Sequence, residues 1–430
     1  MSVELINNTF GNIILKQVIL QIMLIKLKKT FTCCCLIFLL SFLPDISSAQ
    51  KHHTFKPKAA LLTTINKSLQ QSDSQYHLLM KQLLPGRFPV TYYAAKKQLV
   101  TSGSEPWVAG FYPGTLLEVF EATKDSVLYN EALRKLKNLE KEQYDKTTHD
   151  LGFMMHCSFG NADRIHPKGD YKNILVNSAR SLSTRFNKQV GCIRSWDSKP
   201  SEFMVIIDNM MNLELLFAAT RFTGDSSFYK IAVTHANTTM RNHFRVDYSS
   251  YHLVIYDPET GKVIKKQTVQ GAADESAWAR GQAWGLYGYT MMYRETKDPK
   301  YLAQANHIAH FILNNPNLPK DKIPYWDFDA PAIPNTAKDA SAGAIICSAL
   351  IELSKYVNKK DGKIYLASAE TMLRSLSSPA YLSPVGENGG FILKHGTGNF
   401  PKNADIDVPL IYADYYYIEA MLRYKNLNKN

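Results

Sequence analysis

A short turn recurs along this chain, each time between two stretches whose apolar residues have helical spacing. Asp125, Asp225 and Asp298 stand in three of these turns, and Asp361 stands in a looser fourth copy. Each Asp can cap the next helix by accepting hydrogen bonds from its free N–H groups, and an aromatic residue three or four positions later can pack back onto the turn. This pattern predicts successive pairs of helices.

The apolar spacing predicts helices at 113–123 and 127–142, on either side of the first turn. Helix pairs that close into a ring form an α/α toroid, whereas open stacks form a solenoid. Strand-like alternation is confined to short pieces such as 251–256. Because no linker rich in proline, glycine and serine interrupts residues 50–430, we expect a single domain there.

The composition indicates a globular protein and limits its partners. Hydrophobic residues make up 45% of the 430 positions, charged residues 20%, and the net charge is +12. This basic excess favours an anionic partner through long-range attraction. We do not expect that partner to be nucleic acid, because the chain contains no long Lys/Arg run and no recognisable nucleic-acid module.

The N-terminal 49 residues have the layout of a secretory signal. Lys26, Lys28 and Lys29 precede an apolar run at 31–43, and small residues follow at 47–49. The run is shorter than the ~20 residues of a membrane span, so we expect no integral membrane segment. We expect export, most simply to the periplasm, with residues 1–22 as a misassigned extension. Removal of 1–49 lowers the net charge to +10, because four lysines and two acidic residues are lost.

After that removal the cysteines are Cys157, Cys192 and Cys347, an odd and scattered set. They form no CxxC pair and no metal-ligand spacing, so neither a disulfide framework nor a metal site is expected.

Two acidic residues interrupt helical patterns in a way that suits acid–base chemistry. Asp208 directly follows Ile206 and Ile207, and a carboxyl desolvated there should have a raised pKa, as a general acid requires near neutral pH. A helix cap explains Asp208 equally well at this level. Asp150, which follows His149 in a glycine turn, is by itself more often a turn or cap residue.

Arg280 and Trp284 are spaced i, i+4 and share one face of a predicted helix. A guanidinium beside an indole can bind a planar carboxylated ring by bidentate pairing and stacking. Core packing is the more common explanation for two tryptophans at 278 and 284. His252 and Gln270 flank this region as neutral hydrogen-bonding residues.

Taken together, these segments resemble the unsaturated glucuronyl hydrolases, glycoside hydrolase family 88. The similarity spans nearly the whole chain after the signal, from the segment at 107–114 to the segment at 414–420. It rests on the segments at 149–153, 208–212 and 278–284, in that order. The resemblance implies an all-α fold, an (α/α)6 barrel, with the active site in a deep cleft at one end.

The resemblance also implies the reaction and its residues. Members remove a non-reducing-end 4,5-unsaturated uronic acid by hydrating its C4=C5 bond, and they use no metal or organic cofactor. Asp208 matches the acid/base position, and Asp150 matches the second carboxylate, which holds ring hydroxyls. Positions around the sugar match Trp107, His149, Trp196, His252, Gln270, Arg280 and Trp284.

The acceptor sugar is less constrained by the sequence. Members that accept 6-sulfated glycosaminoglycan disaccharides tend to carry a Ser-x-x-Ser-x-Lys stretch after a histidine near the C-terminus. Here the residues after His395 lack both serines and the lysine of that stretch. Glycosaminoglycan and ulvan-type fragments both stay open as substrates. The alternatives are an unsaturated rhamnogalacturonyl hydrolase, with the same chemistry, or a non-catalytic exported glycan-binding protein.

Overall fold

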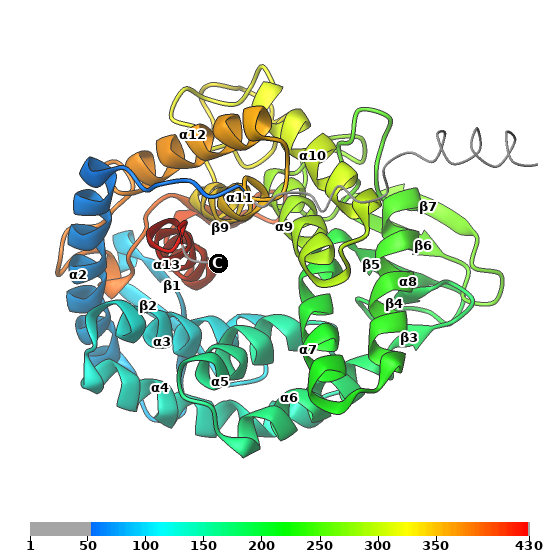
Figure 1. Ribbon diagram of the computed structural model, residues 1–430, viewed down its shortest axis with the longest axis horizontal. Coiled ribbons are helices and arrows are strands. Elements are labelled where there is room, and N and C mark those ends of the chain that lie inside the picture. Colours follow the sequence, from blue (N-terminus) through cyan, green and yellow to red (C-terminus); the bar gives the residue numbers. More distant parts are fainter. Residues whose placement is uncertain (1–52, 429–430) are drawn as a thin grey trace, which may run out of the picture. The chain divides into compact units, whose positions relative to one another are not determined.

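The computed structural model describes residues 53–428, which form two concentric rings of helices (Figure 1). The predicted signal segment, 1–49, lies outside the described residues. The outer ring contains α2 (Ala59–Gln82), α4 (Ser126–Leu139), α6 (Gly169–Ser183), α8 (Ser226–Asn242), α10 (Pro299–Asn314) and α12 (Lys359–Leu376). The inner ring contains α3 (Phe111–Thr123), the π-helical η4 (Gly152–Gly160) with α5 (Asn161–Ile165), α7 (Leu213–Thr223), α9 (Ala279–Thr296), α11 (Ala340–Leu353) and α13 (Ile411–Lys425). This is the predicted (α/α)6 barrel.

The hydrophobicity of each helix decides the ring to which it belongs. Every residue of α11 is buried, and α9 is buried without interruption from Ala279 to Tyr293. By contrast, α4 and α12 bury one face and expose charged residues on the other, as expected of an amphipathic surface helix. The aliphatic and aromatic core therefore lies between the rings and inside the inner ring.

Three of the four predicted turns cap the following helix as expected. Asp125 accepts hydrogen bonds from the N–H groups at the start of α4, and Asp225 and Asp298 do the same for α8 and α10. The residue before each Asp has a left-handed backbone, which glycine adopts without steric cost at Gly224 (φ 74°). This local chemistry reverses the chain from an inner to an outer helix.

The fourth predicted cap is wrong by three residues. Helix α12 begins at Lys359, and Asn358 caps it by accepting from the N–H groups of Lys360 and Asp361. Asp361 therefore lies in the first turn, where its carboxylate accepts a hydrogen bond from the Asn358 amide. The apolar spacing alone does not indicate Asn358, which precedes a lysine pair, as a helix start.

Short strands lie in the segments that connect the helices. Hairpins join β1 (Phe88–Tyr93) to β2 (Gln98–Ser102), β3 (Phe186–Asn187) to β4 (Cys192–Ile193), and β8 (Gly396–Asn399) to β9 (Ala404–Val408). A three-stranded antiparallel sheet contains β5 (Phe203–Ile206), β6 (Leu253–Tyr256) and β7 (Val263–Gln267). Val205 of β5 is paired with Val254 of β6, and Val254 is paired with Lys266 of β7. The predicted strand at 251–256 is thus two residues shorter than expected.

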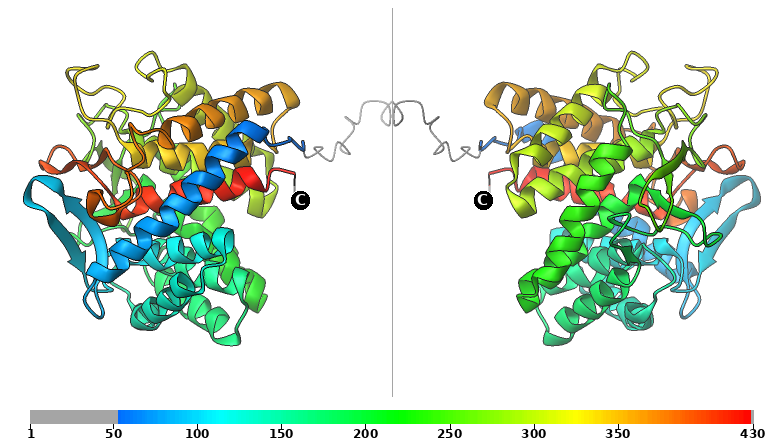
Figure 2. Two further views of the ribbon diagram at one scale, coloured as in Figure 1. Left: turned by 90° about the vertical axis from the view of Figure 1, so that its left-hand side faces the viewer. Right: turned by 90° about the vertical axis from the view of Figure 1, so that its right-hand side faces the viewer.

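The loops of functional interest gather at one end of the barrel. Figure 2 shows the β1–β2 hairpin and the segment that carries β8 and β9 at the same end, with the C-terminus of α13 at the other. A backbone bridge between Thr91 and Leu410 and the packing of β1 on β9 hold these two loops together.

Candidate active site

The N-terminal ends of α3, η4, α7 and α9 contribute residues to the wall of a cavity of about 440 Å³. Trp107 precedes α3 in the 3₁₀ turn η2 (Trp107–Gly110), and Asp208 precedes α7 in η5 (Ile207–Asn212). Asp150 comes just before η4, and Arg280 lies in the first turn of α9. Because helix N-termini present free N–H groups and a positive dipole end, this end of the barrel suits an anionic sugar.

The structure brings seven of the nine predicted site residues to the wall of this cavity. They are Trp107, His149, Asp150, Trp196, Asp208, Gln270 and Arg280.

The remaining two predicted residues, His252 and Trp284, lie behind Asp208 and are buried. His252 packs between the rings of Trp196 and Trp278, at centroid distances of 5.9 and 4.7 Å. The indole N–H of Trp284 lies close enough to the Asp208 carboxyl to lower its pKa, although it forms no hydrogen bond of ordinary geometry among the described residues. In this structure both residues lie beside the acid, and their place around the sugar stays a prediction.

Asp208 has the electrostatics of a general acid. Burial raises its pKa to about 7, and the nearby charge of Asp150 acts in the same direction, while the guanidinium of Arg280 opposes them. This agrees with the expectation drawn from Ile206 and Ile207, both of which are buried. Its Oδ2 has no hydrogen-bond partner among the described residues. Asp208 is therefore a buried acid that can hold or release a proton near neutral pH, and its Oδ2 is enclosed beside His252.

His252 supports Asp208 in one defined tautomer. Its Nδ1 accepts hydrogen bonds from the backbone N–H groups of Val269 and Gln270, at 3.1 and 3.3 Å. The ring hydrogen is therefore on Nε2, which lies 3.8 Å from Asp208 Oδ2. Burial and then the charge of Arg280 lower the pKa of His252 to about 3, so the imidazole is neutral at physiological pH.

Asp150 is tied to the segment that carries Asp208. The side chain of Asn212, at the end of η5, accepts a hydrogen bond from Phe153 N at 3.0 Å and donates one to Asp150 Oδ1 at 3.4 Å. His149 Nε2 lies 3.4 Å from the other carboxylate oxygen. One asparagine thus fixes the two carboxyl-bearing segments relative to each other.

A second asparagine orients His149. Asn209 donates from Nδ2 to Ile193 O and Ser195 Oγ, both at 2.8 Å, so its Oδ1 is the acceptor that faces His149 Nδ1 at 2.7 Å. His149 therefore carries a hydrogen on Nδ1 and presents Nε2 toward Asp150.

Arg280 is held by the N-terminus of α11 and by the backbone of β8. It donates from Nη1 to Asp339 Oδ2 at 2.7 Å and to the carbonyl oxygen of Thr397, and from Nη2 to the carbonyl oxygen of Gly398. Asp339 is the N-cap of α11, and the two carbonyls belong to β8. Among the described residues the Nε edge of the guanidinium has no protein partner, so it is the part that can bind a carboxylate.

Several residues of the site had no role in the sequence prediction. Gln267, Asn399 and Lys402 line the cavity, and Asn209, Asn212 and Asp339 orient the predicted residues. Asn209 and Asn212 stand inside the segment that drew attention to Asp208, at positions that could reach the same end of the helix. Lys402 lies in the β8–β9 loop, where no local pattern marks it.

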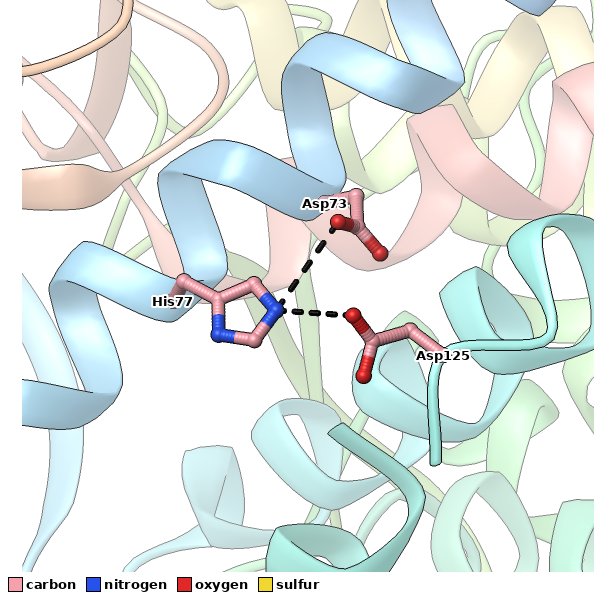
Figure 3. A group of neighbouring side chains, drawn as sticks. All are labelled: Asp73, His77 and Asp125. Atoms are coloured by element: carbon pink, nitrogen blue, oxygen red, sulfur yellow. Dashed lines mark hydrogen bonds and ion pairs between the residues drawn. The ribbon is translucent and has the colours of Figure 1, made fainter. Parts of the chain in front are cut away.

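Among the described residues, one group of side chains has donor atoms close enough to share a metal ion, and it lies away from this cavity (Figure 3). His77 Nε2 lies 2.8 Å from Asp125 Oδ2 and 3.9 Å from Asp73 Oδ2. Asp125 also caps α4, and Thr123 donates to Asp73. These hydrogen bonds account for the group as a link between the outer helices α2 and α4.

Comparison with known proteins identifies the family. A family model described as Glycosyl Hydrolase Family 88 matches residues 86–426. The chain belongs to glycoside hydrolase family 88. The family resemblance and the expectation of an enzyme are thereby confirmed, and this family 88 member is a glycosidase. A non-catalytic glycan-binding protein is no longer an alternative.

Relatives of this family 88 chain include an unsaturated glucuronyl hydrolase from Formosa agariphila. It is 48% identical over 343 residues, which cover 79% of this chain and 85% of the relative. An unsaturated chondroitin disaccharide hydrolase from Streptococcus pneumoniae is 34% identical over 330 residues, 75% of this chain and 83% of the relative.

Solved structures agree with these relatives. An unsaturated glucuronyl hydrolase described as specific for heparin superposes with a TM-score of 0.83 at 48% identity, covering 86% of this chain and 98% of the other. The enzyme from Bacillus sp. GL1 superposes with a TM-score of 0.77 at 28% identity, covering 83% and 96%. These likenesses confirm the (α/α)6 fold. In residues 53–428 we find no helix with the length and apolar character that crossing a membrane requires.

Proposed function

We propose that this glycosidase removes the non-reducing-end 4,5-unsaturated glucuronyl residue from oligosaccharides released by polysaccharide lyases, and that it does so by hydrating the C4=C5 bond. The observation that carries this proposal is Asp208, a buried carboxyl with a pKa raised to about 7 at the wall of a cavity that also contains Asp150. Two carboxyl groups in different environments can act as acid and as ionised partner at the same pH.

In the proposed mechanism Asp208 donates its proton to C4, and a water molecule adds to C5 while returning a proton to the carboxylate. The hydrated C5 is a hemiketal that opens, and the aglycone then leaves without further catalysis. Asp150 holds the ring hydroxyls, and the free edge of Arg280 binds the uronic carboxylate. The separation of the two carboxyls does not predict retention or inversion here, because the reaction is not a displacement at the anomeric carbon.

The test follows the ultraviolet absorbance of the conjugated C4=C5 bond with lyase-generated disaccharides. With wild type the absorbance should disappear as the bond is hydrated. The kcat of Asp208→Asn should be about 10²–10⁴-fold lower than that of wild type, the usual contribution of a general acid. Binding of the same disaccharide to the variant, measured by calorimetry, controls for folding. Full activity of Asp208→Asn, or turnover of unsaturated rhamnogalacturonyl disaccharides alone, would contradict the proposal.

Heparin-derived disaccharides are the first acceptor class to test, because a relative at 48% identity is described as specific for heparin. Chondroitin, hyaluronan and ulvan disaccharides complete the panel, in sulfated and unsulfated forms. The absent serines after His395 predict no strong preference for 6-sulfated acceptors. A fastest rate on a 6-sulfated disaccharide would contradict this part of the proposal.

We also propose that the chain is exported to the periplasm. The lysines at 26, 28 and 29, the apolar run at 31–43 and the small residues at 47–49 support this. Mass spectrometry of the mature protein should find an N-terminus at Gln50. A full-length protein that stays in the cytoplasmic fraction would contradict the proposal.

A further inference from the structure

A second cavity, of about 810 Å³, lies within the inner ring behind the active site. Its walls come from the parts of α3, α7, α9 and α13 that follow the active-site residues along the chain, and from η4 and α5. A layer of aromatic rings separates the two cavities. The ring of Trp284 packs against Phe153 of the active site, at a centroid distance of 5.1 Å, and against Tyr416 of the second cavity, at a centroid distance of 5.4 Å. The proposed hydration reaction uses nothing on the far side of this layer.

The arginines of this second cavity are already paired with acids. The pairs are Arg294 with Glu352 at 2.9 Å and with Glu214, Arg423 with Glu352 at 2.7 Å and with Glu419, Arg164 with Glu121 at 2.7 Å, and Arg221 with Glu295. Lys355 lies within reach of the charge of Glu352. Because these positive groups are neutralised, the cavity offers little to an anionic ligand.

Two carboxyl groups of the cavity, those of Glu118 and Asp163, form no ion pair among the described residues. Glu118 is 2% exposed, lines the cavity, and among the described residues forms no ion pair. Its Oε2 has no hydrogen-bond partner, and neither does Oδ1 of Asp163 on the same wall. Burial, and then the negative charge of Glu419, raise the pKa of Glu118 well above its usual range, although the charges of Arg164 and Arg423 oppose them. With that pKa Glu118 keeps its proton while no ligand is bound. An ammonium ligand would favour the ionised carboxylate, so that Glu118 releases the proton to solvent and pairs with the ligand.

Three tyrosines complete the site. Tyr287, Tyr415 and Tyr416 line the same cavity, and aromatic faces attract organic cations. The volume lies in the usual range for small organic ligands and exceeds the space needed by one metal ion. Among the described residues, no group with metal-ligand geometry lies in this cavity. We propose that this cavity is a second binding site, distinct from the active site, and that it takes a small organic ammonium compound whose charge pairs with Glu118.

Calorimetry with the full mature chain tests this site, using spermidine and glucosamine as ammonium probes and uncharged N-acetylglucosamine as the control. We expect saturable 1:1 binding of at least one amine and none of N-acetylglucosamine. Binding of spermidine alone would indicate that the site takes a linear amine, and binding of glucosamine alone would indicate that it takes an amino sugar. Asp208→Asn should bind the amine as wild type does, which separates this site from the active site and from the proposed function.

Glu118→Gln should weaken amine binding at least tenfold while keeping the glycosidase activity, which reports that the variant has folded. If Glu118→Gln does not fold, Asp163→Asn on the same wall serves in its place, with weaker binding expected. Absence of saturable binding by both amines would overturn the proposal. Unchanged affinity in a folded Glu118→Gln variant would overturn it equally.

Discussion

At the scale of single residues, Asp208 combines a catalytic demand with a cost in stability. A carboxyl whose pKa is raised to about 7 by burial retains its proton in the folded chain, whereas the unfolded chain loses it near the ordinary value of 3.8. The folded state therefore binds more protons between these values, and stability falls as the pH rises through that window. Removing the charge should relieve this cost.

Above pH 7, the free energy of unfolding of Asp208→Asn should accordingly exceed that of wild type by as much as about 4 kcal/mol. Below about pH 4 the two free energies should not differ. Asn does not ionise, so its burial does not become more costly as the pH rises. Urea unfolding at several pH values measures the difference. A gap that stays constant with pH would contradict the raised pKa.

The same group sets the pH profile of the reaction. Since only protonated Asp208 can donate to C4, kcat/KM should fall tenfold per pH unit above about pH 7. His252 contributes no step between pH 4 and 9, because its pKa is lowered to about 3. Rates measured across that range check both statements. A profile that stays flat to pH 9 would exclude Asp208 as the proton donor.

We expect His252 to act through Asp208, as a positioning residue, because its Nε2–H group lies 3.8 Å from Asp208 Oδ2. His252→Gln keeps an N–H donor on the side chain, whereas His252→Leu removes it, so the leucine variant should have a kcat about tenfold or more below that of the glutamine variant. The alkaline step of the pH profile should also shift in the leucine variant alone. Equal rates and profiles in both would assign His252 a packing role only.

At the scale of elements, the helix caps differ in what they hold. Asp225 caps α8 only, while Asp125 caps α4 and also accepts from His77 of α2 (Figure 3). Asp225→Ala should cost about 1 kcal/mol of unfolding free energy, the usual value for a cap. Asp125→Ala should cost more, because it also breaks a hydrogen bond between two helices. Urea unfolding of the pair tests this order, and a smaller loss for Asp125→Ala would contradict it.

The sequence predicted these elements to different degrees. Helix pairs followed from local capping chemistry, which acts over a few residues and is readable at Asp125, Asp225 and Asp298. The positions of Asp208 and Asp150 were readable because each interrupts a helical pattern. Their nearness through Asn212, and the hold of Asp339 on Arg280, depend on segments about 60 residues apart that meet only when the ring closes. No local pattern records such a meeting.

At the scale of the whole molecule, the charge affects how fast substrate arrives. A net charge of +12, or +10 without the signal, attracts an acidic oligosaccharide over a distance that salt shortens. We expect kcat/KM to fall between about 10 and 150 mM salt while kcat changes little, and more steeply for sulfated than for unsulfated disaccharides. Stopped-flow rates measure this. Equal salt dependence for both substrates would rule out steering.

The way in which β8 holds Arg280 has a consequence for how such enzymes diversify. The carbonyl oxygens of Thr397 and Gly398 bind the guanidinium, whereas Asn399 and Lys402 of the same hairpin face the cavity with their side chains. Because the anchor of Arg280 is made by the backbone carbonyls of other positions, substitutions of Asn399 and Lys402 leave it in place. Related enzymes can therefore change the residues at these two positions, and with them the preferred polysaccharide, while the position of Arg280 and the reaction stay the same.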